Sequence, residues 1–270
     1  MSSFDTDSVS RIVEELAADE IVPRFRNLAA SDVREKSPGE LVTAADEAME
    51  RRLTPALLQM LPGSVVVGEE STAADAGLLT LLHGPDPVWV VDPLDGTTNF
   101  ATGVPRFGVM VCLVESGQTV AAWIHLPIAG TTIVAERGGG AWQGGQRLAV
   151  STTKAPYRAV LSTRFFPSPR KQRIDASRAL FHVGESQHCA AATYTQLVSG
   201  DLDVALYYRL MPWDHAPGVL IHAEAGGYSA RLNGEPYSPL VHSEGLLLAP
   251  SEGDWQRTME LIGERPATPG

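Results

Sequence analysis

The stretch of residues 88–100, VWVVDPLDGTTNF, limits most strongly what this chain can fold into. Four apolar residues end abruptly in Asp92, and Asp95 and Gly96 lie in the turn that follows. An apolar run of this kind is typical of a buried strand in a parallel sheet, and Pro and Gly mark the turn. Open α/β sheets bind ligands beyond the carboxyl ends of their strands. The pattern therefore predicts an α/β fold with a ligand site at this strand end.

The two carboxylates of this turn favour a bound cation. Asp92 and Asp95 carry like charges, and ionising both without a partner is unfavourable. A hard ion such as Mg²⁺ removes the conflict, because it prefers oxygen ligands. A calcium loop of the EF-hand type starting at Asp92 does not fit, since Leu94 and Gly96 occupy its third and fifth positions. For an isolated DxxDG the alternative is a simple turn, in which Asp and Thr bond their own backbone.

A second apolar run also ends in carboxylates. Residues 64–67 suit a short strand after a Pro-Gly turn, and Glu69 and Glu70 follow it. One acidic pair after a strand is usually a solvated loop. Two strand ends with the same chemistry indicate one shared site.

Composition narrows the class of protein. The chain has 270 residues, 44% of them hydrophobic, which suits one large domain or two tightly joined halves. Its net charge of −11 argues against a nucleic-acid partner, although bound cations would still allow a phosphate pocket. Cys112 and Cys189 lie outside any CxxC pair, so we expect a reduced, cytoplasmic protein without a zinc site. The N-terminal residues lack a signal-peptide pattern, and no apolar run reaches membrane-spanning length, so no membrane partner is expected.

The rest of the chain predicts alternating helices and strands. Helical spacing covers 8–28 with a break at Pro23, and a second helix starts at Thr43 after a polar loop, 31–40, that carries Lys36. Short runs between Gly-rich turns predict an antiparallel meander over 107–150. Beyond it we expect strands at 159–162, 202–208, 228–232 and 246–249, and helices at 171–180, 190–198, after Met211 and after Ser251. We interpret the chain as a single domain with an N-terminal half (about 8–150), a C-terminal half (about 151–262) and a flexible tail (263–270).

Some polar residues also have purely structural interpretations. Thr43 and Asp46 have the spacing of a capping box, with Asp in place of Glu, and on this evidence alone Asp46 is as readily structural as functional. Asp214 is a candidate N-cap of the helix that starts near it. His215 suits a surface or packing role better than that of a metal ligand.

Four longer strings carry a resemblance to a known family. They are KSPGELVTAAD at 36–46, GEES at 68–71, DPLDGTTNF at 92–100 and PWDHAPGVLIHAEAGG at 212–227. Over roughly residues 8–262 the chain resembles the inositol monophosphatase family of Mg²⁺-dependent phosphomonoesterases. The resemblance implies a layered α/β (α+β) fold, the αβαβα sandwich of the inositol monophosphatase and fructose-1,6-bisphosphatase type. It also implies metal-assisted hydrolysis of a small phosphate monoester, a homodimer and inhibition by Li⁺.

By motif position, the resemblance implies roles for individual residues. The metal ligands would be Glu69, Asp92, the backbone carbonyl of Leu94, Asp95 and Asp214, with Asp92 bridging two Mg²⁺ ions and a third, weaker ion near Glu69. Asp46 and Thr97 would position and activate the attacking water, with Glu69 as a further catalytic residue and Lys36 at the edge of the site. The substrate-binding set would be Asp95, Gly96, Thr97, Thr98, Ala190, Tyr207, Arg209 and Asp214.

The acidic residues suit a metal-dependent phosphomonoesterase, but the residues at the alcohol-binding positions differ from those of members that act on inositol phosphate. Cations must neutralise a phosphate dianion that repels hydroxide, and paired metals generate a nucleophile at neutral pH. Family members that act on inositol phosphate carry a Glu seven residues before the final Asp of the motif. Here Tyr207, or Arg209 in a gapped alignment, takes that place, and the usual Gly-Ser/Thr pair before the Ala-rich helix is His188-Cys189.

The substrate therefore stays open. Inositol 1-phosphate, histidinol phosphate, nucleotide 3′-phosphates and sugar phosphates are all used within the wider superfamily. Arg209 would favour an acidic or doubly phosphorylated substrate if it faces the pocket, and otherwise it is a surface residue. A non-catalytic regulatory protein on the same fold is the alternative from another class.

Overall fold

Helices and strands alternate along the chain much as the sequence predicts. The computed structural model describes residues 5–151, 155–184 and 187–264. The helices are α1 (Thr6–Glu20), α2 (Ala44–Met60), α3 (Glu69–Ala74), α4 (Thr97–Ala101), α5 (Ser168–Ser177), α6 (Ala190–Ser199), α7 (Pro212–Glu224) and α8 (Glu252–Leu261). The strands are β1 (Val33–Ser37), β2 (Glu40–Thr43), β3 (Val65–Gly68), β4 (Val88–Asp95), β5 (Gly108–Glu115), β6 (Gln118–Leu126), β7 (Thr131–Glu136), β8 (Gly140–Gln143), β9 (Gln146–Arg147), β10 (Arg158–Leu161), β11 (His182–Val183), β12 (Val204–Tyr207), β13 (Tyr228–Arg231) and β14 (Leu246–Ala249).

Most described strands belong to one of two sheets. The seven-stranded sheet has the order β3-β4-β5-β6-β7-β8-β9, and the five-stranded sheet has the order β11-β10-β12-β14-β13. The meander predicted over 107–150 is confirmed as the antiparallel run from β5 to β9. Strand β4 pairs parallel with β3 but antiparallel with β5, so our prediction of a parallel strand holds on one side only.

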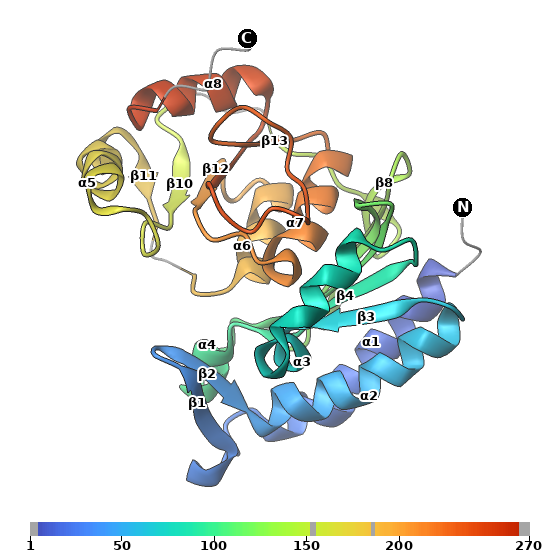
Figure 1. Cartoon of the computed structure of the whole chain (residues 1–270). Coiled ribbons are helices and arrows are strands. Elements are labelled where there is room, and N and C mark those ends of the chain that lie inside the picture. Colours follow the sequence, from blue (N-terminus) through green and yellow to red (C-terminus); the bar gives the residue numbers. More distant parts are fainter. Residues whose placement is uncertain (1–4, 152–154, 185–186, 265–270) are drawn as a thin grey trace.

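The elements stack in five layers (Figure 1). Helices α1 and α2 lie below the seven-stranded sheet, α6 and α7 lie between the two sheets, and α5 and α8 lie beyond the five-stranded sheet. This is the predicted αβαβα order. Among the described residues, no helix combines the length and apolar character needed to cross a membrane.

The layer order explains why β4 is apolar at every position before its acids. Trp89 and Val91 pack with residues of α1 and α2, whereas Val88 and Val90 pack with residues of α6 and α7. Successive side chains of a strand point to opposite faces, and both faces of β4 are covered. The strand therefore reads as a continuous hydrophobic run up to the point where Asp92 emerges.

The prediction of a polar loop at 31–40 is wrong. Residues 33–43 form the β1–β2 hairpin, with Val33 opposite Thr43 and Glu35 opposite Leu41. Gly39 has a φ of +77°, which the tight turn between these strands requires. Most side chains of β1 are exposed, so the hairpin is held by backbone pairing and leaves no hydrophobic signature in the sequence.

The predicted tail begins too early. Glu264 is only 7% exposed and forms ion pairs with Arg170 and Arg173, so residues 263–264 belong to the folded part. Residues 265–270 lie outside the described part of the chain. Among the helix starts, Ser251 is confirmed as the N-cap of α8, because its side chain accepts a bond from the backbone N–H of Asp254.

Candidate active site

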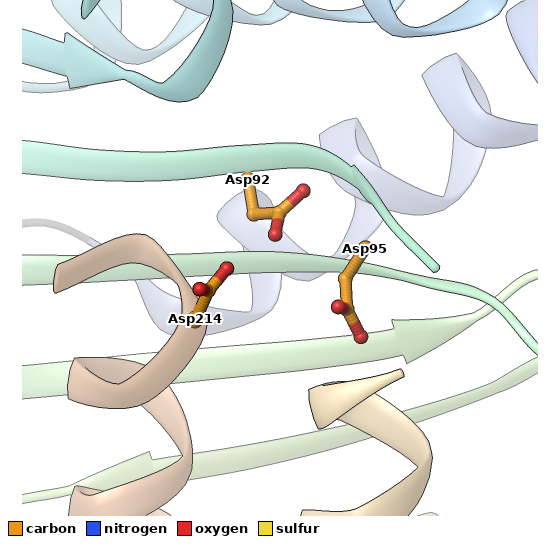
Figure 2. A group of neighbouring side chains, drawn as sticks. All are labelled: Asp92, Asp95 and Asp214. Carbon is orange, nitrogen blue, oxygen red and sulfur yellow. The ribbon is translucent and has the colours of Figure 1, made fainter. Parts of the chain in front are cut away.

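Three carboxylates converge between the two sheets (Figure 2). Asp92 and Asp95 come from the end of β4, and Asp214 comes from the first turn of α7. One oxygen from each of the three side chains lies within 4.8 Å of the others. Asp214 is not the N-cap that it resembles in the sequence, because Met211 holds that position and Asp214 lies inside the helix.

The three carboxyl groups cannot all be charged at low cost without a cation. Burial raises the pKa of Asp92, Asp95 and Asp214, and the neighbouring carboxylate of Glu69 raises each further. Asp92 is only 1% exposed, so water cannot screen the repulsion. The donor set consists of oxygen atoms alone, which fits Mg²⁺ or another hard divalent ion and gives no reason to invoke zinc.

The chain fixes Asp95 from the opposite half of the molecule. Its Oδ2 accepts the backbone N–H of Ala191 at 2.7 Å and the thiol of Cys189 at 2.9 Å. Both donors lie at the start of α6, where Cys189 is the N-cap. After Asp95 the chain reverses at Gly96, whose φ is +86°, and a Cβ there would lie 2.9 Å from the carbonyl oxygen of Arg106. Glycine is therefore required for the turn that separates the acids from α4.

Asp46 caps the start of α2 and also contacts Thr97, and its role in activating water stays a prediction. Its Oδ2 accepts the backbone N–H of Thr43 at 2.9 Å, which confirms the capping box at the start of α2. Its Oδ1 lies 3.0 Å from the hydroxyl of Thr97, and that hydroxyl also lies 3.0 Å from the carbonyl oxygen of Leu94. Burial raises the pKa of Asp46 to about 6, close to the range that suits a general base.

Glu69 lies beside the acidic cluster and is bound to a cation of the chain itself. Lys36 Nζ donates to Glu69 at 2.6 Å and to Glu70 at 2.8 Å. Burial alone would lower the pKa of Lys36, but the two glutamates outweigh it and raise that pKa. Burial and the charge of Glu69 raise the pKa of Glu70 to about 7. Lys36 thus lies at the edge of the site, and the role of Glu69 as a metal ligand stays a prediction.

Glu50 belongs to the surroundings of the site, although no motif in the sequence singles it out. This buried side chain accepts the backbone N–H groups of Glu70 at 2.9 Å and Ser71 at 2.8 Å, and so holds the start of α3. A Cβ on Gly68 would lie 2.4 Å from the Glu50 carboxyl carbon, so the glycine makes room for it. The available signal was spacing, because a charged residue four positions after Asp46 falls on the buried face of α2.

A cavity of about 220 Å³ opens beside the carboxylates. Its lining is Asp95, Ser162, Phe165, Ala190, Tyr207, Tyr208, Arg209, Asp214 and His215. Arg209 faces this cavity while its guanidinium forms an ion pair with Glu40 of the β1–β2 turn. A larger cavity of about 590 Å³, between the β5–β6 turn, α7 and β13, lies away from these acids.

The remaining predicted residues differ in how near the cavity they lie. Thr98 is exposed on α4 and does not line the cavity. His215 is buried, with one ring nitrogen 3.0 Å from the Tyr194 hydroxyl and the other 3.1 Å from the carbonyl oxygen of Arg209. Burial lowers its pKa to about 4, so of the surface and packing roles predicted for His215 the structure supports packing.

Comparison with known proteins decides the family. The chain matches the family model described as "Inositol monophosphatase family" over residues 5–267. It belongs to this family. Both the resemblance drawn from the four motifs and the predicted αβαβα fold are therefore confirmed.

Individual family members show how broad the family is. The chain is 33% identical over 221 residues to the Nus factor SuhB of Pseudomonas aeruginosa, covering 78% of this chain and 80% of that protein. It is 32% identical over 207 residues to the inositol-1-monophosphatase of Rhizobium meliloti, covering 74% of this chain and 75% of that protein. The crystal structure of the extragenic suppressor protein suhB from Bartonella henselae superposes with a TM-score of 0.80 at 24% identity, covering 94% of this chain and 98% of that one.

Proposed function

We propose that this protein is a Mg²⁺-dependent phosphatase that hydrolyses a small phosphate monoester. The observation that carries the proposal is the convergence of Asp92, Asp95 and Asp214. Asp92 and Asp95 are buried, Asp214 is half-buried, and among the described residues none of the three has a cation of the chain bonded to it. A structural carboxylate of this burial is normally paired, as Asp203 is with Arg158. Three carboxylates without such a partner favour a bound metal ion.

The metal would be held by the oxygen atoms that converge here. We assign Asp92, Asp95, Asp214, the carbonyl of Leu94 and Glu69 to two or three Mg²⁺ ions. When bound, such ions neutralise the phosphate dianion, provide a nucleophile at neutral pH and stabilise the leaving alkoxide. The backbone N–H of Leu94 donates to Asp92 at 3.1 Å, which orients that carboxylate before any ion arrives.

Thr97 and Asp46, beside the acidic cluster, would position and deprotonate the attacking water. Thr97 orients the attacking water through its hydroxyl, and Asp46, 3.0 Å from that hydroxyl, accepts the proton released. We assign Gly96, Thr98 and Ala190 to contacts with the phosphate and its ester oxygen. Tyr207 and Arg209 belong to the wall against which the alcohol packs.

The alcohol pocket argues against dedicated recognition of inositol. Among the described residues, the walls around Asp95 and Asp214 are formed by tyrosines, Phe165, Ala190 and Arg209, and no further carboxylate lines the cavity to bind ring hydroxyls. A site lacking such partners gains little from those hydroxyls. We therefore expect inositol 1-phosphate to be hydrolysed at most ~10-fold better than glycerol 2-phosphate, as measured by the ratio of kcat/KM. Histidinol phosphate and nucleotide or sugar phosphates remain candidate substrates.

A panel assay tests the proposal. Phosphate release from p-nitrophenyl phosphate, glycerol 2-phosphate, inositol 1-phosphate and histidinol phosphate is measured with Mg²⁺ and with EDTA. We expect release that requires Mg²⁺ and is inhibited by Li⁺. A preference for inositol 1-phosphate above ~100-fold, about 2.7 kcal/mol, would show that another residue binds the ring. Absence of release from every ester would contradict the phosphatase assignment.

A regulatory role is the second candidate, favoured by the name of one relative, a Nus factor. The two roles separate in the panel assay, since a non-catalytic protein releases no phosphate at any Mg²⁺ concentration. We also infer that the two halves act as one domain, because the acids come from both. A cytoplasmic homodimer is part of the same proposal, and light scattering of the purified chain measures its mass.

A further inference from the structure

The cavity beside the acids has a positively charged rim that the hydrolysis itself does not use. Arg209 lines the cavity, and its Cζ lies 4.4 Å from the centroid of the Phe165 ring. The Cζ of Arg164 lies 5.1 Å from the same centroid. Two guanidinium groups therefore gather around one aromatic ring at the cavity mouth, and that ring is itself 41% exposed.

Neither guanidinium is fully used by the protein. The bond from Arg209 to Glu40 involves only Nη1, and no other described residue accepts a bond from Nε or Nη2, so both are available to a ligand. Among the residues that the structure describes, Arg164 has no acidic partner. Its Nη2 would lie 2.7 Å from a Cβ on Gly39, so it rests against the β1–β2 turn beside Glu40.

The position of Arg209 is fixed by its backbone. The carbonyl oxygen of Arg209 lies 3.1 Å from Nε2 of His215, which is buried, lines the cavity and contacts Tyr194. Asp214 lies on the same cavity wall, so a phosphate bound at the acids places the rest of its ester next to Arg209. The guanidinium itself is held by Glu40 and the Phe165 ring, and its remaining donors suit bidentate binding of a carboxylate or phosphate.

We propose that the alcohol part of the substrate carries a second acidic group, a carboxylate or a further phosphate, and that Arg209 and Arg164 bind it. This inference rests on the phosphatase function proposed above and names its substrate class. The cavity volume of about 220 Å³ corresponds to about seven water molecules at ~30 Å³ each, which accommodates a short alcohol with one extra charged group. The net charge of the chain is −11, so its surface as a whole repels anions. The two guanidinium groups at the cavity rim make this one place attractive to an anion.

Glu40 would share Arg209 with the substrate. Its carboxylate also accepts the Ser37 hydroxyl at 2.7 Å, so it stays at the rim and its negative charge opposes an incoming anion. A purely structural ion pair behaves differently, since it ties the β1–β2 hairpin to the C-terminal half for every substrate alike. If the ion pair contributes to substrate recognition, Arg209→Gln and Glu40→Gln should change the preference for acidic substrates in opposite directions. If the pair only holds the hairpin in place, the two variants should have the same effect on activity.

Matched substrate pairs test the inference. Glycerol 2-phosphate and 2-phosphoglycerate differ by a carboxylate near the ester, and glucose 1-phosphate and glucose 1,6-bisphosphate differ by a distant phosphate. The measured quantity is the ratio of kcat/KM between the members of each pair, with saturating Mg²⁺. We expect the wild type to prefer the more acidic member of at least one pair by about 10-fold or more, as charge-assisted hydrogen bonds allow. The pair that shows the preference identifies the acidic group as carboxylate or phosphate.

The variants make the test specific. Arg209→Gln should reduce that ratio by about 10-fold and Arg164→Gln by less, whereas Glu40→Gln should raise it. Arg52→Gln is the matched control, because Arg52 is similarly exposed and ion-paired but lies on α2, and it should leave the ratio unchanged.

Three results would overturn the inference. The first is turnover of all four esters without a preference in either pair, which would leave the phosphatase function standing. The second is a preference that survives Arg209→Gln. The third is a preference for p-nitrophenyl phosphate that Phe165→Leu removes, since the cavity would then bind a planar ring. Absence of Mg²⁺-dependent release from any ester would overturn the proposed function together with this inference.

Discussion

Asp92 and Asp214 lie far apart in the chain, yet carboxylate oxygens of the two lie within 4.8 Å of each other. Asp92 lies near the end of β4 in the seven-stranded sheet, and Asp214 lies in the helix layer that packs between the sheets. Bringing them together opposes folding, because the two are like-charged, Asp92 is buried and Asp214 is half-buried. The arrangement therefore has the form of a site that is stabilised by its ligand.

The first prediction concerns the stability that the protein loses by bringing these like charges together. Asp214→Asn removes one of the repelling charges, so in EDTA at pH 7.5 its Tm should exceed that of the wild type, by about 2–4 °C for each kcal/mol relieved. Mg²⁺ should in turn raise the Tm of the wild type more than that of the variant. Differential scanning calorimetry measures both effects.

Asp203 provides a matched control for that experiment. It is also buried, but Arg158 donates to both of its carboxylate oxygens. Asp203→Asn should lower the Tm with and without Mg²⁺, since it leaves a cation without its partner. The account of the acidic cluster fails if Asp214→Asn lowers the Tm in EDTA in the same way.

The second prediction separates the two roles of Asp46. Asp46→Asn should lower kcat by about 10²–10⁴-fold, the usual contribution of a general base. Thr43→Ala breaks the same capping box and should cost about 1 kcal/mol of stability while reducing kcat far less. Steady-state kinetics and urea unfolding measure the two quantities. Equal losses of stability with similar kcat in the two variants would make Asp46 a capping residue only.

A third prediction concerns Glu50, which holds the N-terminus of α3 next to Glu69. Glu50→Gln keeps the shape of the side chain but loses the charge and one of two acceptors for the N–H groups of Glu70 and Ser71. We expect a lower Tm and a higher Mg²⁺ concentration for half-maximal activity. Glu47→Gln is the control, because Glu47 is exposed on the same helix and pairs with Arg34. If both variants need the same Mg²⁺ as the wild type, Glu50 only stabilises the fold.

The fourth prediction is a dependence of stability on pH. Burial lowers the pKa of His222 from 6.5 to about 4. The unfolded chain binds this proton below pH 6.5 and the folded chain does not, so the stability is complete above pH 6.5 and is lost as the pH falls towards 4. Between pH 7 and pH 5 the Tm of His222→Gln should therefore fall less than that of the wild type. The exposed His83, replaced in the same way, should show the wild-type dependence, and identical curves for all three proteins would contradict the assignment.

The sequence predicts most reliably the parts that bury apolar residues. Strand β4, the meander and the helices follow from their hydrophobic spacing, and the acids at the two strand ends follow from the turns after them. The β1–β2 hairpin has no such spacing, since Arg34 and Glu35 are exposed. The folded chain extends past its predicted end for a related reason, because Glu264 is held by ion pairs with Arg170 and Arg173 of α5.

Within the site, contacts between distant side chains could not be predicted. No local pattern indicates that Lys36 binds Glu69 or that Arg209 binds Glu40, since these partners meet only after both halves have folded. The helical spacing places Glu50 on the buried face of α2, but it does not indicate that the carboxylate binds the N–H groups at the start of α3. What the sequence does predict is the chemistry at the strand ends, where residue type and position in the sheet together determine the function.

One measurement tests the central claim most directly. Phosphate release from glycerol 2-phosphate is followed while Mg²⁺ is added back to metal-free protein, for the wild type and for Asp92→Asn. The wild type should be inactive without metal and gain activity as Mg²⁺ saturates, and Asp92→Asn should lose about 10³-fold or more of kcat/KM at every Mg²⁺ concentration. Full activity of the metal-free wild type, or wild-type activity of Asp92→Asn, would contradict the account.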